Sequence, residues 1–178
     1  MSAFSVEHQA KTLATRAHEG QKYGLGEPYT VHLEDVRNIL VEFGFSGEED
    51  NDYLVGAWLH DVLEDTETTQ EFLQQTFGTH AIAMVWAVTG RGKNRRERNE
   101  DAYKKIIAYP DAIPLKLADR LSNGRNSKRD KLDLYDMYRD EYPNFRARLK
   151  PATKPDFRTT DMWNALDKLF HFFEITFP

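Results

Sequence analysis

Hydrophobic residues recur along most of the chain at the three-to-four-residue spacing of an amphipathic helix. Two of these stripes contain four residues each: Leu33, Val36, Leu40 and Phe43, then Ile82, Val85, Trp86 and Val88. Runs in which apolar and polar residues alternate between hairpin turns are scarce, so the pattern does not support a sheet. The chain is therefore expected to be all-α, a helical bundle of about eight helices.

Glycine and proline residues stand where these helices are expected to end. The residues concerned are Gly44, Gly78, Gly90, Pro110 and Pro143. Residues 151–160, PATKPDFRTT, are expected to form a loop that leads to a last amphipathic helix, MWNALDKLFHFF. The apolar face of that helix should close the core, and it consists of Trp163, Leu166, Leu169 and Phe170.

The size and composition of the chain predict one globular domain. Of its 178 residues, 40% are hydrophobic and 12% are aromatic, which is enough for a sizeable core. We expect a single domain over residues 1–178, with the motifs described below in a core at 17–123. C-terminal helices within residues 130–176 are expected to pack on that core.

The composition also narrows location and chemistry. No run approaches eighteen apolar residues, and the N-terminal segment lacks the charged-then-apolar layout of a secretory signal, so a cytoplasmic protein without membrane contact is expected. Because the chain has no cysteine, a bound metal must be held by histidine, aspartate or glutamate. The net charge of −5 argues against a nucleic-acid binder.

Positive charge is concentrated in two segments of this acidic chain. RGKNRRER, residues 91–98, holds five basic residues against one glutamate, and RLSNGRNSKRDK, residues 120–131, holds five against one aspartate. Such segments suit a small polyanion better than a duplex. The alternative is that both are solvated helix ends or loops.

The stretch AWLHDVLEDT, residues 57–66, places one histidine and three carboxylates in what is otherwise expected to be a buried helix. Charged side chains are rarely buried unless they are paired or bind a metal. On a helix His60 would lie over Glu64 and Asp61 over Asp65, and His60 and Asp61 could lean toward one point between them. A metal ion at that point would explain the cluster, but two ligands are too few to hold it.

His32 and Asp119 are the candidates for the missing ligands. His32 stands at the start of an amphipathic helix, and Asp119 stands in a largely buried one. Each also has an ordinary explanation, because a lone histidine is commonly structural and Asp119 could pair with a nearby base such as Lys116, Arg120 or Arg125. The ordered set His32, His60-Asp61, Asp119 favours the metal site.

That order resembles the HD superfamily of metal-dependent phosphohydrolases, in which four such side chains hold one divalent ion. The flanking strings AHEGQKYG and EPYTVH (within 17–32), AWLHDVLEDT and LKLADRLSN (115–123) are more specific. They resemble the hydrolase domain of the RelA/SpoT group and its free-standing relatives, the small alarmone hydrolases, among them the metazoan SpoT homologues. The likeness covers residues 17–123 and fades toward the C-terminus.

The resemblance implies an enzyme that removes the 3′-pyrophosphate from guanosine tetra- or pentaphosphate, usually with Mn²⁺. It implies four metal ligands: His32, His60, Asp61 and Asp119. Glu64 and Asp65 fall on the family's Glu-Asp pair, which positions or deprotonates the attacking water. Asn123 falls on a nucleotide contact, and Lys22 falls where a basic residue, usually arginine, lies against the base.

Elementary chemistry agrees with these roles. A divalent ion polarises phosphoryl oxygens and makes a nucleophile from water, and Glu64, one turn beyond His60, would face that water as a base. Arg91 and the basic run that it begins, with Lys116 and Arg120, could neutralise the phosphoryl oxygens. Tyr138, by a loose alignment, would flank the base together with Lys22 through stacking or cation–π contact. The alternative for Tyr138 is a core aromatic on an amphipathic helix.

Three residues depart from the family pattern: Lys22 replaces arginine, Leu33 replaces proline, and Gly124 replaces a bulky residue. These changes are expected to affect substrate recognition and not metal binding. Too few residues follow the motifs for a synthetase domain, so only hydrolysis is expected. Three hypotheses remain: a (p)ppGpp hydrolase or one for a close analogue, a hydrolase of another small nucleotide such as a nucleoside monophosphate or the 2′-phosphate of NADPH, and a non-catalytic nucleotide-binding module. The oligomeric state is not defined by the sequence.

Overall fold

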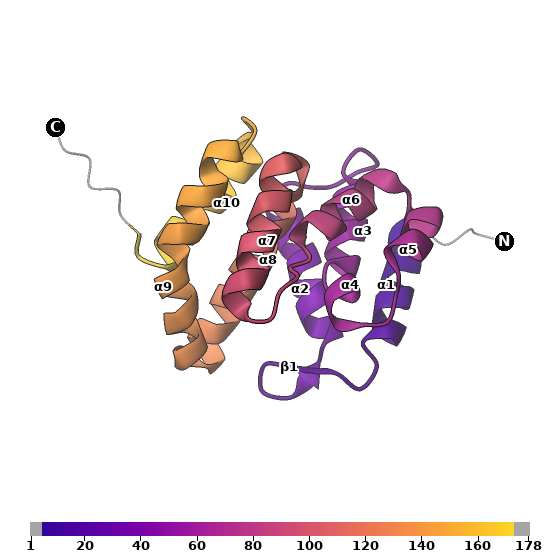
Figure 1. Ribbon diagram of the computed structural model, residues 1–178, viewed down its shortest axis with the longest axis horizontal. Helices are drawn as coiled ribbons and strands as arrows, with labels where there is room; N and C mark the ends of the chain where they lie inside the picture. The colour runs from indigo at the N-terminus through magenta and orange to yellow at the C-terminus, as the bar shows by residue number, and fades with distance from the viewer. Residues whose placement is uncertain (1–4, 173–178) are drawn as a thin grey trace.

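The structure is a computed structural model, and it describes residues 5–172. The described chain is built almost entirely of helices, as predicted, with one short β-hairpin (Figure 1). No helix among these residues has the length and apolar character that crossing a membrane would require.

The first half of the described chain begins with a helix and the hairpin and continues with five further helices. The elements are α1 (Val6–Ala17), β1 (Lys22–Tyr23), β2 (Glu27–Pro28), α2 (Thr30–Glu42), α3 (Asn51–Leu59), α4 (Val62–Asp65), α5 (Gln70–Phe77) and α6 (Thr79–Val88). The two strands pair antiparallel, with Lys22 opposite Pro28. Each strand has two residues, which is too short for an alternating pattern to reveal it in the sequence.

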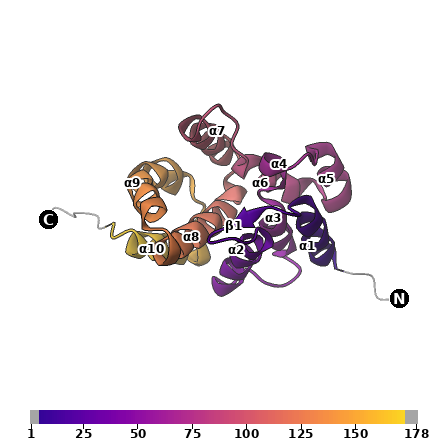
Figure 2. The ribbon, with the colours of Figure 1, turned by 90° about the horizontal axis from the view of Figure 1, so that it is seen from below.

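The second half consists of four longer helices and two short 3₁₀ turns. These are α7 (Arg95–Ala108), the 3₁₀ turn Pro110–Ala112, α8 (Ile113–Asp130), α9 (Leu132–Leu149), the 3₁₀ turn Lys150–Ala152 and α10 (Phe157–Leu169). Helix α8 lies between the α9–α10 pair and the group formed by α1, α2 and α3 (Figure 2), and it packs on α2, α9 and α10.

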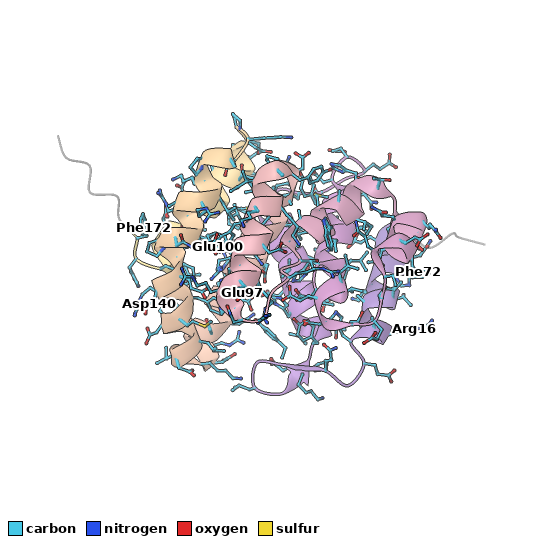
Figure 3. All side chains as sticks on the ribbon, in the orientation of Figure 1. Arg16, Phe72, Glu97, Glu100, Asp140 and Phe172 are labelled. Atoms are coloured by element: carbon cyan, nitrogen blue, oxygen red, sulfur yellow. The ribbon has the colours of Figure 1, made fainter. Side chains whose placement is uncertain are left out.

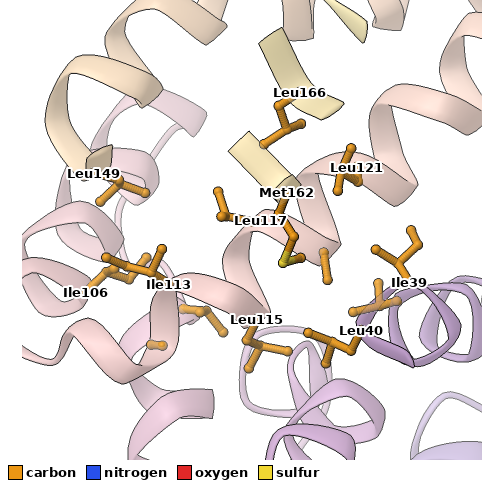
Figure 4. Packing of buried hydrophobic residues seen from close by; sticks show 14 of the residues in the cluster. Ile39, Leu40, Ile106, Ile113, Leu115, Leu117, Leu121, Leu149, Met162 and Leu166 are labelled. Atoms are coloured by element: carbon orange, nitrogen blue, oxygen red, sulfur yellow. The ribbon is translucent and has the colours of Figure 1, made fainter. Parts of the chain in front are cut away.

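The core consists of two apolar clusters. The larger one surrounds α8, whose Leu115, Leu117 and Leu121 meet side chains of α2 and α10 such as Leu40 and Met162 (Figure 4). The smaller one fills the space between α1, α3, α5 and α6. Each fully buried aliphatic side chain stabilises the fold by about 1.5–3 kcal/mol, so the buried leucines of α8 anchor this helix firmly in the bundle. Charged residues such as Arg16, Glu97 and Asp140 lie on the outside (Figure 3).

Helix boundaries differ from the prediction in α9 and α10, and α10 ends at Leu169, before the predicted end at Phe173, which lies outside the described residues. Pro143 lies inside α9 and does not end a helix. Proline cannot donate to the carbonyl of Arg139, but both residues are exposed, so water can take the place of that donor. Helix α10 begins at Phe157, five residues before the predicted start at Met162, because the side chain of Asp156 caps it by accepting a hydrogen bond from the Arg158 amide at 2.8 Å.

Candidate metal centre

The helix predicted over residues 57–66 is interrupted at its centre. Helix α3 ends at Leu59 and α4 begins at Val62, with the Asp61 backbone at φ −100° and ψ −7° between them. His60 turns its Nδ1 toward the Ala57 carbonyl, 2.8 Å away. The prediction of one continuous helix was therefore wrong, and His60 and Asp61 occupy a turn from which both side chains enter the interior.

Four side chains from three parts of the chain converge beside this turn. His60 Nε2 lies 3.3 Å from His32 Nε2 and 3.0 Å from Asp61 Oδ2, and His32 Nε2 lies 3.5 Å from the same carboxylate oxygen. Asp119 Oδ1 lies 3.5 Å from His32 Nε2 and 3.9 Å from His60 Nε2. Atoms about 2.1 Å from one ion lie about 3.0–3.4 Å apart at right or tetrahedral angles, so the spacing suits a shared cation.

The hydrogen bonds of the two imidazoles determine which nitrogen faces the centre. The Ala57 carbonyl can only accept, so His60 Nδ1 carries a hydrogen. Ser122 Oγ donates to Asp35 at 2.6 Å and so accepts from His32 Nδ1 at 3.0 Å. In their neutral forms both rings therefore present an Nε2 lone pair to the centre, where the two nitrogens face each other. Facing lone pairs repel unless a positive charge lies between them.

The electrostatics of the centre favour the ionised carboxylates that a metal needs. Burial opposes the charge on Asp61, but His60 beside it holds the pKa of that carboxyl well below its usual range. Burial opposes ionisation of Asp119 too, and Lys116, 2.8 Å from its Oδ2, lowers that pKa. Burial would lower the pKa of His60, yet Asp61 and Asp119 outweigh it and raise the value to about 9. The site thus attracts positive charge.

Asp119 is held differently from the other three residues. The group whose ligand atoms all lie within 4.8 Å of one another consists of His32, His60 and Asp61. Asp119 is drawn toward Lys116 and accepts a hydrogen bond from the Asn123 side chain. Its Oδ1 is therefore shared between the histidine pair and Asn123, which is on the same helix.

A polar cavity of about 290 Å³ opens beside the four residues. Glu64 and Asp65 line it on the side of the turn. The cavity wall also carries four cationic side chains: Arg95, Arg98, Lys116 and Arg120. Such a wall suits an anionic ligand that reaches from the four converging residues across the cavity.

Glu64 is fixed at the edge of this cavity. Its Oε2 accepts a hydrogen bond from the Gly90 amide at 3.0 Å, and its Oε1 lies 3.5 Å from Arg98 Nε. Partial burial raises the pKa of Glu64, and burial also raises that of Asp65. Both groups thus hold a proton more readily than exposed carboxyls do.

A second cavity of about 400 Å³ adjoins the first, and the two residues predicted to contact a base, Lys22 and Tyr138, line it. Lys22 and Asn123 line it, and Tyr138 and Tyr23 stand between the two cavities. Tyr138 is half-buried, with the guanidinium groups of Arg95 and Arg120 each 5.0 Å from its ring centre.

Arg91 does not line either of these cavities. Its guanidinium packs over the ring of Trp86 at 4.9 Å, and its amide donates to Asp101. Arg95 and Arg98, from the same basic run, face the cavity instead, because they lie on one face of α7 three residues apart. The structure therefore does not bring Arg91 to the predicted substrate contacts.

Two of the three departures from the family pattern belong to the core. A Cβ atom on Gly124 would lie 2.7 Å from Leu169 Cδ2 and 2.8 Å from Phe170 Cζ, so α10 packs directly on the glycine. Leu33 is fully buried in the smaller apolar cluster. Of the three residues only Lys22 lines either of the two cavities, and the expectation that Leu33 and Gly124 affect substrate recognition stays a prediction.

Several residues that surround the centre were not predicted from the sequence. Tyr29 donates a hydrogen bond to Asp61 Oδ2 at 2.7 Å. Tyr23 stacks on the His32 ring with 4.6 Å between ring centres, and Ser122 accepts from His32. Tyr29 and Tyr23 stand in the quoted strings AHEGQKYG and EPYTVH, and Ser122 stands beside Asn123, but only the folded chain shows which atoms they touch.

Comparison with known proteins identifies the class. Residues 10–149 match the family model of the HD domain, and the chain belongs to this family. It is 39% identical over 120 residues to the guanosine-3′,5′-bis(diphosphate) 3′-pyrophosphohydrolase of Aquifex aeolicus. The aligned residues make up 65% of this chain and 17% of that protein. It is 36% identical over 125 residues to the bifunctional (p)ppGpp synthase/hydrolase SpoT of Escherichia coli, again 17% of that protein. The chain thus spans a small part of these relatives.

A solved structure shares the fold over nearly the whole chain. A metazoan ortholog of SpoT, described as hydrolysing ppGpp and acting in starvation responses, aligns with a TM-score of 0.79 and 23% identity. The alignment covers 96% of this chain and 97% of that one. A protein of Listeria monocytogenes aligns with a TM-score of 0.58 and 24% identity. The shared fold of the metazoan protein therefore extends into the α9–α10 region.

Proposed function

We propose that the protein is a phosphohydrolase that depends on a divalent metal held by His32, His60, Asp61 and Asp119. The observation that carries this proposal is the pair of Nε2 atoms 3.3 Å apart, each with its Nδ1 engaged elsewhere and with the carboxyl groups of Asp61 and Asp119 beside them. The donor set is nitrogen and oxygen only, which suits Mn²⁺, and we propose Mn²⁺ as the ion.

The proposed substrate is guanosine-3′,5′-bis(diphosphate), its pentaphosphate form or a close alarmone analogue, from which the 3′-pyrophosphate is released. The names of the curated relatives support this choice. The cationic wall of the first cavity and its polar lining also suit a small nucleotide with several phosphates. A nucleotide and not a nucleic acid is thus the proposed partner, and a cytoplasmic location stays a prediction from the sequence.

Each acidic group of the cavity has a distinct proposed role. A bound divalent ion would supply Lewis acidity toward a phosphoryl oxygen and would lower the pKa of water. Glu64 accepts the proton of the attacking water, because its carboxylate lines the cavity and burial raises its pKa, which makes it a stronger base than an exposed glutamate. Asp65, its neighbour, orients the same water.

The cations and the second cavity would hold the substrate. Lys116 and Arg98 neutralise the phosphoryl oxygens, since both line the cavity that three of the proposed ligands, His32, Asp61 and Asp119, also line. The base would enter the adjoining cavity, where Lys22, Asn123 and Tyr138 line the walls. Arg91 has no role in this proposal.

An end-product assay tests the proposal. Protein with Mn²⁺ is incubated with ppGpp, NADPH and nucleoside monophosphates, and pyrophosphate and orthophosphate are measured separately. We expect pyrophosphate from ppGpp. Asp61→Ala and Asp119→Ala should abolish its release, while Asp136→Ala, which removes an exposed carboxylate paired with Arg139, should not. Orthophosphate as the product, or turnover of the other nucleotides only, would show a hydrolase of another small nucleotide. Binding of a nucleotide without any product would show a non-catalytic nucleotide-binding module.

A further inference from the structure

The turn at His60 and Asp61 is held from outside by the segment between α1 and α2. Gln21 Nε2 donates to the Asp65 carbonyl at 3.0 Å, and the Tyr29 amide donates to the Gln21 carbonyl at 3.2 Å. Helix α4 ends at Asp65, so the carbonyl of that residue has no donor from a following turn of the helix, and Gln21 supplies one from the distant segment.

Tyr29 links this segment to the metal centre itself. Its hydroxyl donates to Asp61 Oδ2 at 2.7 Å and lies 3.3 Å from Asp65 Oδ2. The same Asp61 oxygen is 3.0 Å from His60 Nε2. A carboxylate oxygen has two lone pairs, so it can accept from Tyr29 with one and face the centre with the other. The tyrosine therefore determines how Asp61 presents that second lone pair.

The ring of Tyr29 is itself held in place by His18. The two rings stack with 4.6 Å between centres and 15° between planes, and His18 is 2% exposed. Since Gln21 Nε2 is used by the Asp65 carbonyl, Gln21 Oε1 accepts from His18 Nδ1 at 2.8 Å. His18 Nε2 is buried without a hydrogen-bond partner. An unpaired buried nitrogen costs about 1–3 kcal/mol, so this ring serves contact and orientation at the expense of stability.

We propose that Tyr29 is a positioning residue of the metal centre, which fixes the Asp61 carboxylate for the cation and ties it to Asp65, with His18 and Gln21 holding the tyrosine. The inference rests on the metal site of the proposed function. It assigns a physical role to the AHEGQKYG and EPYTVH strings, which surround the turn and contribute only His32 to the proposed ligand set. Residues that orient a ligand commonly change metal affinity 10–100-fold when they are replaced.

The experiment is a calorimetric titration of Mn²⁺ alone into the metal-free chain. Tyr29→Phe removes one oxygen atom and keeps the ring, and we expect it to weaken Mn²⁺ binding by about 10-fold or more. Tyr53→Phe is the matched control, because Tyr53 is a partly buried tyrosine that packs against the larger core cluster. The affinity of this variant for Mn²⁺ should equal that of the wild type. Circular dichroism melts establish that each variant is folded.

Gln21→Leu is the second variant, and it tests the same support without touching the hydroxyl. We expect an intermediate loss of Mn²⁺ affinity, since the tie to the Asp65 carbonyl is lost but the bond to Asp61 remains. In Tyr29→Phe, saturating Mn²⁺ should restore a large part of kcat, whereas it should restore none in Asp61→Ala.

The outcomes separate this inference from the proposed function. Wild-type Mn²⁺ binding with an unchanged affinity in folded Tyr29→Phe and Gln21→Leu would overturn the inference and leave the proposed function intact. Absence of Mn²⁺ binding in the wild type would overturn the metal site, and the inference with it.

Discussion

Glu141 on α9 accepts two hydrogen bonds from the Arg95 guanidinium, at 2.6 and 3.0 Å, and so joins α9 to α7 beside the first cavity. A third bond, from Arg120 at 3.1 Å, brings α8 into the same contact. One carboxylate thus neutralises two of the four cations of the cavity wall, and Arg120 is only 3% exposed.

Removal of this carboxylate should destabilise the fold. Glu141→Ala leaves the buried Arg120 without its counter-charge, and breaking such a pair costs about 3 kcal/mol. Urea unfolding followed by circular dichroism measures the change. Asp136→Ala breaks an exposed pair with Arg139 on the same helix and should change the free energy of unfolding by less than about 0.5 kcal/mol. Equal effects of the two variants would show that the Glu141 pair is not a buried one.

The same pair predicts a pH dependence of stability. Although burial opposes it, hydrogen bonding with Arg95 lowers the pKa of Glu141 below its ordinary value of 4.5. A carboxyl with a depressed pKa in the folded state stabilises the fold fully above the unfolded value, and this contribution is lost as pH falls through the folded value. The stability difference between the wild type and Glu141→Gln should therefore be constant near pH 7 and shrink below pH 4.5. A difference that grows on acidification would contradict the assignment.

The raised pKa of Glu64 should determine the acidic limb of the pH–rate profile. The base must be ionised, and burial raises its pKa above the ordinary value of 4.5, so kcat should fall on acidification at a higher pH than an exposed glutamate would give. Rates at saturating Mn²⁺ between pH 4.5 and 8 measure the limb. Glu64→Gln should lose about 10²-fold or more in kcat at pH 7. Full activity of that variant would remove Glu64 from the mechanism.

Arg98 and Arg91 offer a matched comparison within one basic run. Arg98 lines the first cavity and Arg91 packs on Trp86 outside it. Arg98→Ala should raise KM for ppGpp by about 10-fold, equivalent to about 1.4 kcal/mol of binding, and Arg91→Ala should leave KM unchanged. Initial rates over a range of substrate concentrations measure both. The reverse order would return Arg91 to the substrate contacts predicted from the sequence.

A larger side chain at position 124 should lower the stability of the fold without changing substrate recognition. A side chain there must displace Leu169 and Phe170, so Gly124→Val should destabilise the fold by about 2 kcal/mol with KM unchanged. Lys128→Val is the control, because it introduces the same residue at an exposed position of α8. Thermal melts and KM together decide the matter. A changed KM with unchanged stability would favour a substrate contact at this position.

The sequence predicted the fold class, and it singled out four residues that lie close together in the folded chain. The helical spacing of Leu33, Val36 and Leu40 is a local signal, so it survives in the folded chain as α2. His60 and Asp61 are adjacent, and His32 and Asp119 were added by their order and surroundings. These four residues do converge, although their role as ligands stays a proposal.

The remainder depended on contacts that no local pattern contains. The helix break at His60 results from a side-chain bond to the Ala57 carbonyl, and the early start of α10 results from the Asp156 cap. Tyr29 meets Asp61 across 32 positions of the chain. Such distances are set by how α2 and α3 pack together, which the spacing of apolar residues limits but does not determine.

Helix α8 has one face at the candidate metal centre and another in the apolar core. Asp119, Ser122 and Asn123 look toward the histidines and the two cavities, while Leu117, Leu121 and Gly124 are packed in the core. Because both faces belong to one helix, a displacement of α8 moves its polar and its apolar side chains together. The packing of α10 on Gly124 therefore also helps to hold Asp119 beside the two histidines.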